Sequence, residues 1–164
     1  DPATDLAPGY TDPIQVTDTA YNDNAIWVDF TDVNPRNFRL GVFGELDTWN
    51  PENLPPNDNP NFLGRLVVVS EPPFANGRWT HVAIVYEGLG GSSGKATLYL
   101  DGIAQGSSAG IVEPFGWDFA TASIRLGVNF VGLMDDLAVF DRPLNVQEIE
   151  ALRSLEGGVA NLNR

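Results

Sequence analysis

The sequence predicts an all-β protein, an antiparallel sandwich of two sheets with one short C-terminal helix. Three observations predict it: apolar residues alternate in many short runs, Gly- and Pro-rich turns separate the runs, and the one stretch with helical periodicity comes late in the chain. The chain has 164 residues, and 43% of them are hydrophobic, which is enough for one domain with a sizeable core. We therefore expect a single domain over residues 1–164.

The predicted strands are short, and most of them have one apolar face. Residues 25–31, for example, place Ile26, Val28 and Phe30 on the same side. Asp101 and Gly102 have the composition of a two-residue hairpin turn between two further strands. In chain order, strands are expected over residues 25–31, 37–43, 64–70, 79–87, 96–100, 103–106, 122–127 and 133–141.

One helix is expected near the end of the chain. Asn145 and Glu148 have the spacing of a capping box. Ile149, Leu152 and Leu155 then form an apolar stripe, and a pair of glycines ends the helix.

The first 24 residues show no clear period and contain three prolines. Three interpretations remain open for residues 1–24: an extended arm, an edge strand, or the incomplete first strand of a divergent domain. The chain starts at Asp1 without a Met or an apolar leader, which suggests a mature or excised piece of a longer protein.

Composition excludes several classes of function. The net charge is −13, which argues against a nucleic-acid partner, because phosphate binding depends on clustered Lys and Arg. No apolar run approaches the ~18 residues that span a bilayer, so membrane insertion is not expected. The chain contains no cysteine, which excludes thiolate catalysis and zinc sites with Cys ligands.

Several motifs occur in an order typical of one family. A Trp-Thr-His-Val-Ala run begins at Trp79, and Leu98 begins Leu-Tyr-Leu-Asp-Gly. An Ile-Arg-Leu-Gly run begins at Ile124, and Gly132 begins Gly-Leu-Met-Asp-Asp-Leu-Ala-Val-Phe. This order resembles the bacterial laminin G-like branch of the concanavalin A-like lectin/glucanase jelly rolls, most closely over residues 77–155.

The resemblance implies a two-sheet jelly roll. It also implies a module of a larger exported protein, with neighbouring glycan-acting or adhesive domains, at an extracellular, cell-surface or periplasmic location. It fixes no activity, since the same fold serves lectins, hydrolases and spacers.

Catalysis is not expected. The family's glucanases carry a Glu-x-Asp-x-Glu strand, which this chain lacks. Asp135 and Asp136 are adjacent on a predicted strand, so they point to opposite faces and cannot flank one glycosidic bond. His81 is the only histidine, and no base partner lies near it in the sequence.

Asp135 is a candidate metal ligand, because it shares the predicted core face of Leu137 and Val139. A buried carboxylate needs a partner. One interpretation pairs Asp135 with Arg142 or with backbone amides. The other is a structural calcium ion held by Asp135 with loop oxygens, such as those of Asp12, Asp23 or Asp58. The acidic first sixty residues supply the oxygens that calcium prefers, although a merely solubilising acidic surface explains them too.

Two predicted loops, residues 47–61 and 106–117, are candidate ligand sites, because each places a tryptophan beside polar residues, as a sugar platform requires. The alternative is that each tryptophan anchors its own loop to the sandwich. The candidate ligand-binding residues are Trp49, Asn50, Asn57, Asp58, Trp117 and Asp118. The sequence therefore predicts a non-catalytic module that binds carbohydrate or matrix, with a glycan or an extracellular protein as partner and with calcium assistance as one variant. A protein-interaction or spacer domain without sugar affinity is the alternative.

Overall fold

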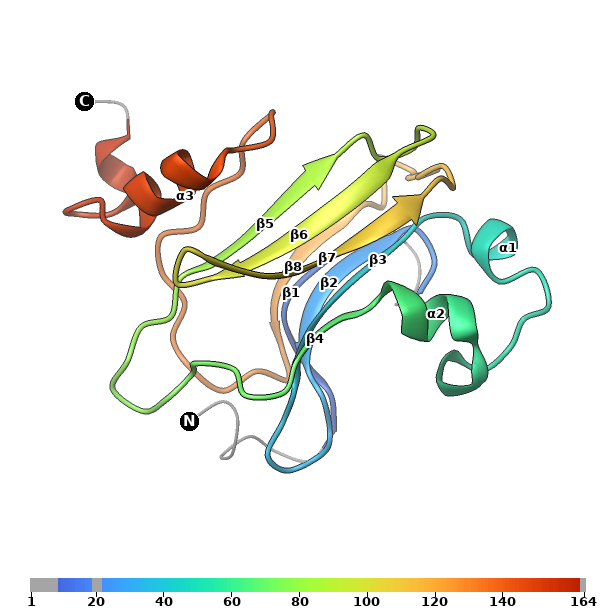
Figure 1. The fold of residues 1–164 in the computed structure, drawn as a ribbon, viewed down its shortest axis with the longest axis horizontal. Helices are drawn as coiled ribbons and strands as arrows, with labels where there is room; N and C mark the ends of the chain where they lie inside the picture. Colours follow the sequence, from blue (N-terminus) through green and yellow to red (C-terminus); the bar gives the residue numbers. More distant parts are fainter. Residues whose placement is uncertain (1–8, 19–21, 163–164) are drawn as a thin grey trace.

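The computed structural model describes residues 9–18 and 22–162, which form two antiparallel sheets packed face to face (Figure 1). The larger sheet has the strand order β4-β3-β2-β1-β8, and the smaller has the order β5-β6-β7. The strands are β1 Thr11–Thr17, β2 Ala25–Phe30, β3 Phe38–Phe43, β4 Val67–Val69, β5 Val82–Glu87, β6 Gly94–Leu100, β7 Ile103–Ile111 and β8 Ser123–Val128. The predicted mainly-β, two-sheet sandwich is confirmed.

The helices are short and lie outside the sheets. They are α1 Leu46–Trp49, α2 Pro60–Arg65 and α3 Val146–Arg153, with single 3₁₀ turns η1 Pro56–Asp58 and η2 Val159–Asn161. α3 begins with the predicted capping box, in which Asn145 accepts from the Glu148 amide and Glu148 accepts from the Asn145 amide. The late helix is therefore confirmed, whereas α1, α2 and η1 divide a segment that the sequence indicated only as a loop.

The main core lies between the two sheets. Val28 of β2 is paired with Leu40 of β3, and both side chains point toward Leu98 in the core cluster. All three are essentially inaccessible to solvent. The alternation predicted for residues 25–31 is thus confirmed on this face.

A second apolar cluster covers the outer face of the larger sheet. It joins Trp27 and Phe43 of the sheet to Trp49 of α1 and Phe62 of α2. Gly41 faces Trp27 across the β2–β3 ladder, and a Cβ there would lie 2.2 Å from the indole ring, so only glycine fits. Both faces of β2 and β3 are consequently buried, which the alternation alone did not predict.

The structure decides two points that concern residues 11–17 and 133–141. Of the three interpretations left open for residues 1–24, the edge strand does not hold for residues 11–17, because β1 lies between β2 and β8. The strand expected over residues 133–141 does not form, and those residues are exposed. The first eight residues and residues 19–21, which belong to the predicted N-terminal arm, lie outside the described part of the chain.

Candidate functional site

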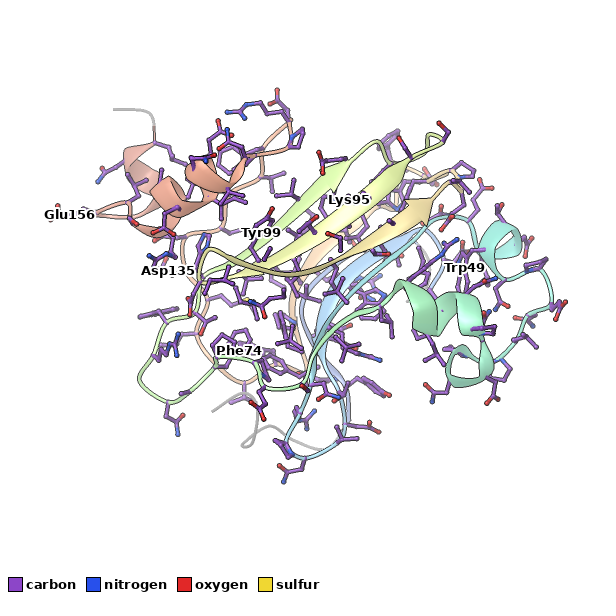
Figure 2. The ribbon with its side chains drawn as sticks, viewed as in Figure 1. Trp49, Phe74, Lys95, Tyr99, Asp135 and Glu156 are labelled. Carbon is purple, nitrogen blue, oxygen red and sulfur yellow. The ribbon has the colours of Figure 1, made fainter. Side chains whose placement is uncertain are left out.

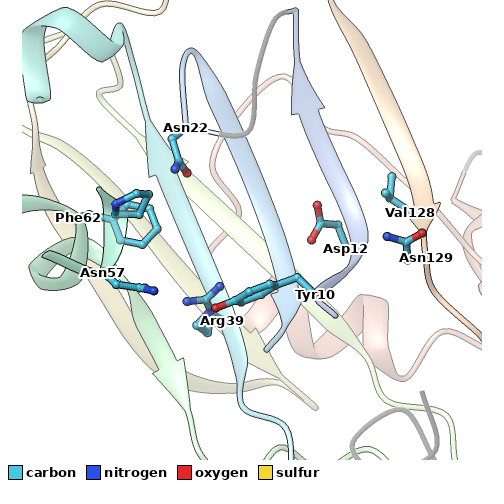
Figure 3. A pocket seen from close by; sticks show the side chains of 9 residues that line it. Tyr10, Asp12, Asn22, Arg39, Asn57, Phe62, Val128 and Asn129 are labelled. Atoms are coloured by element: carbon cyan, nitrogen blue, oxygen red, sulfur yellow. The ribbon is translucent and has the colours of Figure 1, made fainter. Parts of the chain in front are cut away.

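A hollow of about 360 Å³ opens on the outer face of the larger sheet (Figure 3). Tyr10 and Asp12 contribute from the start of β1, Arg39 from β3, and Asn57 from η1. The remaining lining residues are Asn22, Pro56, Phe62, Val128 and Asn129. The hollow therefore combines an aromatic ring with several hydrogen-bonding groups from five separate parts of the chain.

Arg39 is held in place by a buried ion pair. Its Nε donates to Oδ1 of Asp29 at 2.8 Å, and its Nη2 donates to the other carboxylate oxygen. Asp29 is wholly buried, and the pair spans the β2–β3 ladder. The guanidinium also lies 5.1 Å from the ring centre of Tyr10 and 5.3 Å from that of Trp27. These contacts fix the position of the Tyr10 ring at the mouth of the hollow.

Asp12 is the acid of the hollow, and it is only 7% exposed. Burial raises the pKa of its carboxyl to about 7, the negative charge of Asp29 adds to that rise, and Arg39 opposes it. At neutral pH the carboxyl is therefore divided between its protonated and ionised forms. It can donate a hydrogen bond in the first form and accept hydrogen bonds in the second.

The raised pKa of Asp12 predicts a pH-dependent stability. In the unfolded chain this carboxyl has a pKa of about 4, so between about pH 4 and pH 7 the folded protein retains a proton that the unfolded chain has lost. The contribution of Asp12 to stability therefore falls as the pH rises through that window. We expect Asp12→Asn to match the native protein at pH 4 and to exceed its free energy of unfolding by about 2–4 kcal/mol at pH 8.

Urea unfolding at pH 4 and pH 8 measures this effect. Asp58→Asn is the control, because Asp58 is exposed and does not line the hollow. If the free energies of unfolding of Asp12→Asn and the native protein differed by the same amount at both pH values, the raised pKa of Asp12 would be contradicted.

Trp49 does not form the exposed platform expected from the sequence. Its side chain is 3% exposed and packs against Phe43 and Phe62, with ring centres 4.8 and 6.1 Å away. Its Nε1 donates to the backbone oxygen of Asn22. The prediction of an exposed Trp49 is wrong, because the outer face of the sheet is apolar and burying the indole against it is more favourable than exposing the indole to water.

The loop that contains Trp49 is organised by buried asparagines. Oδ1 of Asn50 accepts from the Leu54 amide at 3.0 Å and from Nδ2 of Asn59 at 2.7 Å. Asn59 also caps α2. Asn50 is therefore a structural residue of this loop, Asp58 is exposed outside the hollow, and Asn57 is the predicted ligand-binding residue that reaches the hollow.

The second predicted loop does not line the hollow. Trp117 is partly buried, packs edge-to-face on Phe115, and donates from Nε1 to the backbone oxygen of Asn24. Asp118 is exposed, and its amide donates to a carboxylate oxygen of Asp18. These contacts attach the loop to the sandwich.

The three candidate metal ligands do not assemble. Asp135 is exposed rather than core-facing, at the opposite end of the molecule from Trp49 (Figure 2), and Arg142 bonds Glu148 instead of Asp135. Oδ1 of Asp23 accepts from the Leu46 amide. Within residues 9–18 and 22–162, no group of three or more His, Cys, Asp or Glu side chains could hold a metal ion. The calcium interpretation stays a prediction.

Sequence reasoning thus identified Asp12 and Asn57 in the hollow and missed most of their neighbours. Asp12 was assigned to a metal site and Asn57 to a sugar site, whereas the structure brings them together. The signal for Arg39 was available, because it shares the non-core face of a predicted strand with Gly41. Tyr10 carried no such signal, since it precedes the first strand.

The match to one protein-family model agrees with this fold. The family model of the concanavalin A-like lectin/glucanases superfamily matches residues 14–150. A search of curated proteins finds no match. A solved structure, the S-layer domain-containing protein (residues 221–444) from Clostridium thermocellum ATCC 27405, is similar at 19% identity with a TM-score of 0.41. The similarity covers 90% of this chain and 64% of that one, so this chain spans less than two thirds of its length. No helix in the described ranges is long and apolar enough to cross a membrane.

Proposed function

Because the chain belongs to the concanavalin A-like lectin/glucanase superfamily, we propose that it is a non-catalytic carbohydrate-binding module of an exported protein and that the hollow is its binding site. One observation carries this proposal. The ring of Tyr10, 41% exposed, stands beside Asp12 and Asn57 at the same hollow. An aromatic face next to hydrogen-bonding groups suits a sugar, whose C–H face is apolar and whose edge carries hydroxyls.

The polar groups of the hollow suit a hydroxyl-rich ligand. Asn57 and Asn129 each offer an amide that both donates and accepts. Asn22 also lines the hollow, and its Oδ1 accepts no hydrogen bond from the described residues. Asp12 can serve as donor or acceptor near neutral pH.

The same residues favour binding over hydrolysis. A glycosidase needs two carboxyl groups about 5–9 Å apart, one on each side of the scissile bond. Asp12 is the one carboxyl among the residues that line the hollow in the described part of the chain. Asp29 does not line the hollow, and Arg39 engages it in a buried pair. A glycan of an extracellular matrix or cell surface is therefore the proposed partner.

Affinity electrophoresis in soluble polysaccharides, followed by a glycan array, tests the proposal. We expect native protein to be retarded by at least one polysaccharide, and Tyr10→Ala to bind it at least tenfold more weakly because the stacking face is lost. Trp79→Ala is the matched control, since Trp79 is an exposed aromatic residue outside the hollow. Repeating the assay with EDTA tests the proposed assistance by calcium.

Two results would refute this function. One is the absence of binding to every polysaccharide and array glycan. The other is binding that Trp79→Ala weakens as much as Tyr10→Ala does. Turnover of a β-glucan, lost in Asp12→Asn, would refute the non-catalytic part alone.

A further inference from the structure

The segment between β4 and β5 forms a loop that projects from the sandwich (Figure 1). This loop contains Asn76 followed directly by Gly77, and Asn76 is the one asparagine of the chain that precedes a glycine. Neither residue lines the hollow or belongs to a core cluster. The pair is therefore separate from the proposed sugar site.

Asn76 and Gly77 occupy the tip of an exposed turn. Residues 75–79 are all exposed, and the Arg78 amide closes the turn by donating to the backbone oxygen of Ala75 at 3.2 Å. Gly77 has a φ of +71°, which glycine adopts without strain. A Cβ at Gly77 would meet none of the described residues within 4 Å, apart from its chain neighbours. Water therefore reaches both residues.

The turn does not engage the backbone N–H of Gly77. The hydrogen bond across the turn comes from the next amide, that of Arg78. None of the residues that the structure describes accepts a hydrogen bond from the Gly77 amide. An exposed amide of this kind can lose its proton to solvent without breaking a native contact.

We propose that Asn76 is a site of spontaneous covalent modification, at which its side-chain amide is converted to isoaspartate and aspartate. The deprotonated nitrogen of Gly77 forms a bond to Cγ of Asn76. The bond between Cγ and Nδ2 breaks, and the side-chain nitrogen takes up a proton and leaves as ammonia. The product of this step is a cyclic imide.

Water then opens the imide in one of two ways. Attack at the backbone carbonyl carbon of residue 76 gives isoaspartate, in which the chain continues through Cγ. Attack at Cγ gives aspartate. Each complete conversion consumes one water molecule and releases one ammonia, so no oxidant, cofactor or enzyme is needed.

The other asparagines lack this combination of features. Asn53 and Asn129 are also exposed, but a leucine and a phenylalanine follow them, and a side chain on the attacking residue crowds the forming ring. Asn50 and Asn59 are buried and hydrogen-bonded to each other. We therefore expect modification to be concentrated at residue 76.

Both products place a carboxylate two residues before Arg78. The Arg78 guanidinium pairs with one carboxylate oxygen of Asp101, and the other oxygen accepts from the His81 amide at 3.0 Å. The new carboxylate competes for Arg78. Isoaspartate also adds one carbon to the backbone path, which displaces the turn. The modification thus acts just before β5.

Incubation of the whole chain, followed by peptide mapping, tests the inference. The peptide that contains Asn76 should gain about 1 Da and separate into two products. Isoaspartyl methyltransferase should transfer a methyl group from S-adenosylmethionine to one of them. Conversion should be roughly tenfold or more faster at Asn76 than at Asn53 or Asn129. It should also be faster at pH 9 than at pH 6, because the attacking nitrogen must lose its proton.

Two controls accompany the native chain. Asn76→Gln should show no conversion at this position, because the longer side chain would have to close a larger ring. A synthetic peptide of residues 72–80 gives the rate without the fold, and the whole chain should convert within about tenfold of it, since the turn is exposed.

Three results would overturn the proposal. They are conversion of the peptide without conversion of the whole chain, equal conversion at Asn53 or Asn129, and an equal mass gain in the same peptide of Asn76→Gln. None of them affects the sugar assay, which reports on the separate Tyr10 site.

Discussion

Arg39→Met is expected to lower the free energy of unfolding by about 3–5 kcal/mol, because it removes the cation that pairs with the wholly buried carboxylate of Asp29. The same change removes the cation from between the rings of Tyr10 and Trp27, so the hollow should lose its shape as well. Chemical denaturation followed by far-UV circular dichroism measures the loss.

Two further variants distinguish the effect of the buried charge on stability from the effect of lost packing. The double variant Asp29→Leu/Arg39→Met should recover most of the stability, since an apolar pair of similar volume replaces a buried ion pair at little net cost. Arg78→Met removes an exposed partner of Asp101 and should cost less than about 1 kcal/mol. If the double variant were as unstable as the single one, packing rather than charge would be the cause.

Trp49→Ala is the second large effect, with an expected loss of about 3–5 kcal/mol from the cavity left among Phe43 and Phe62. The loop of residues 47–61 would then lose its main apolar anchor. Thermal or urea unfolding measures the change, and Trp79→Ala, at an exposed indole, should stay within about 0.5 kcal/mol of native. A Trp49→Ala variant of native stability that fails to bind glycan would restore Trp49 as a ligand platform.

Most of the strands could be predicted from the sequence, because the patterns that produce them are local in the chain. Residues 25–31 and 96–100 alternate, and the Asp101-Gly102 turn and the Asn145 cap act over two to four residues. The strand expected over residues 133–141 failed for the opposite reason. Alternation describes a half-buried strand, but a strand also needs a neighbour with which it pairs, and this segment pairs with no strand of the described sheets.

The candidate site was less predictable, because its members meet only through the fold. Tyr10, Arg39 and Asn57 come from three distant parts of the chain, and the β1–β2–β3 order brings the first two together. The sequence left two interpretations of Trp49 open, because a tryptophan among prolines and asparagines looks the same whether its loop projects into solvent or folds onto a sheet. The apolar outer face of β2 and β3 decided between the two.

The anchored loop of residues 47–61 affects how selective the hollow can be for its ligand. Asn57 stands in a 3₁₀ turn between prolines and Asn59, on a loop anchored by Trp49 and by the Asn50–Asn59 hydrogen bond. Few conformations remain for such a loop to lose when a ligand arrives, so association carries a small entropic penalty. Because the loop is rigid, it also cannot change its conformation to fit ligands of different shape. If the hollow binds a sugar as proposed, it should accept a narrow range of ligand shapes and distinguish sugars that differ in the orientation of one hydroxyl.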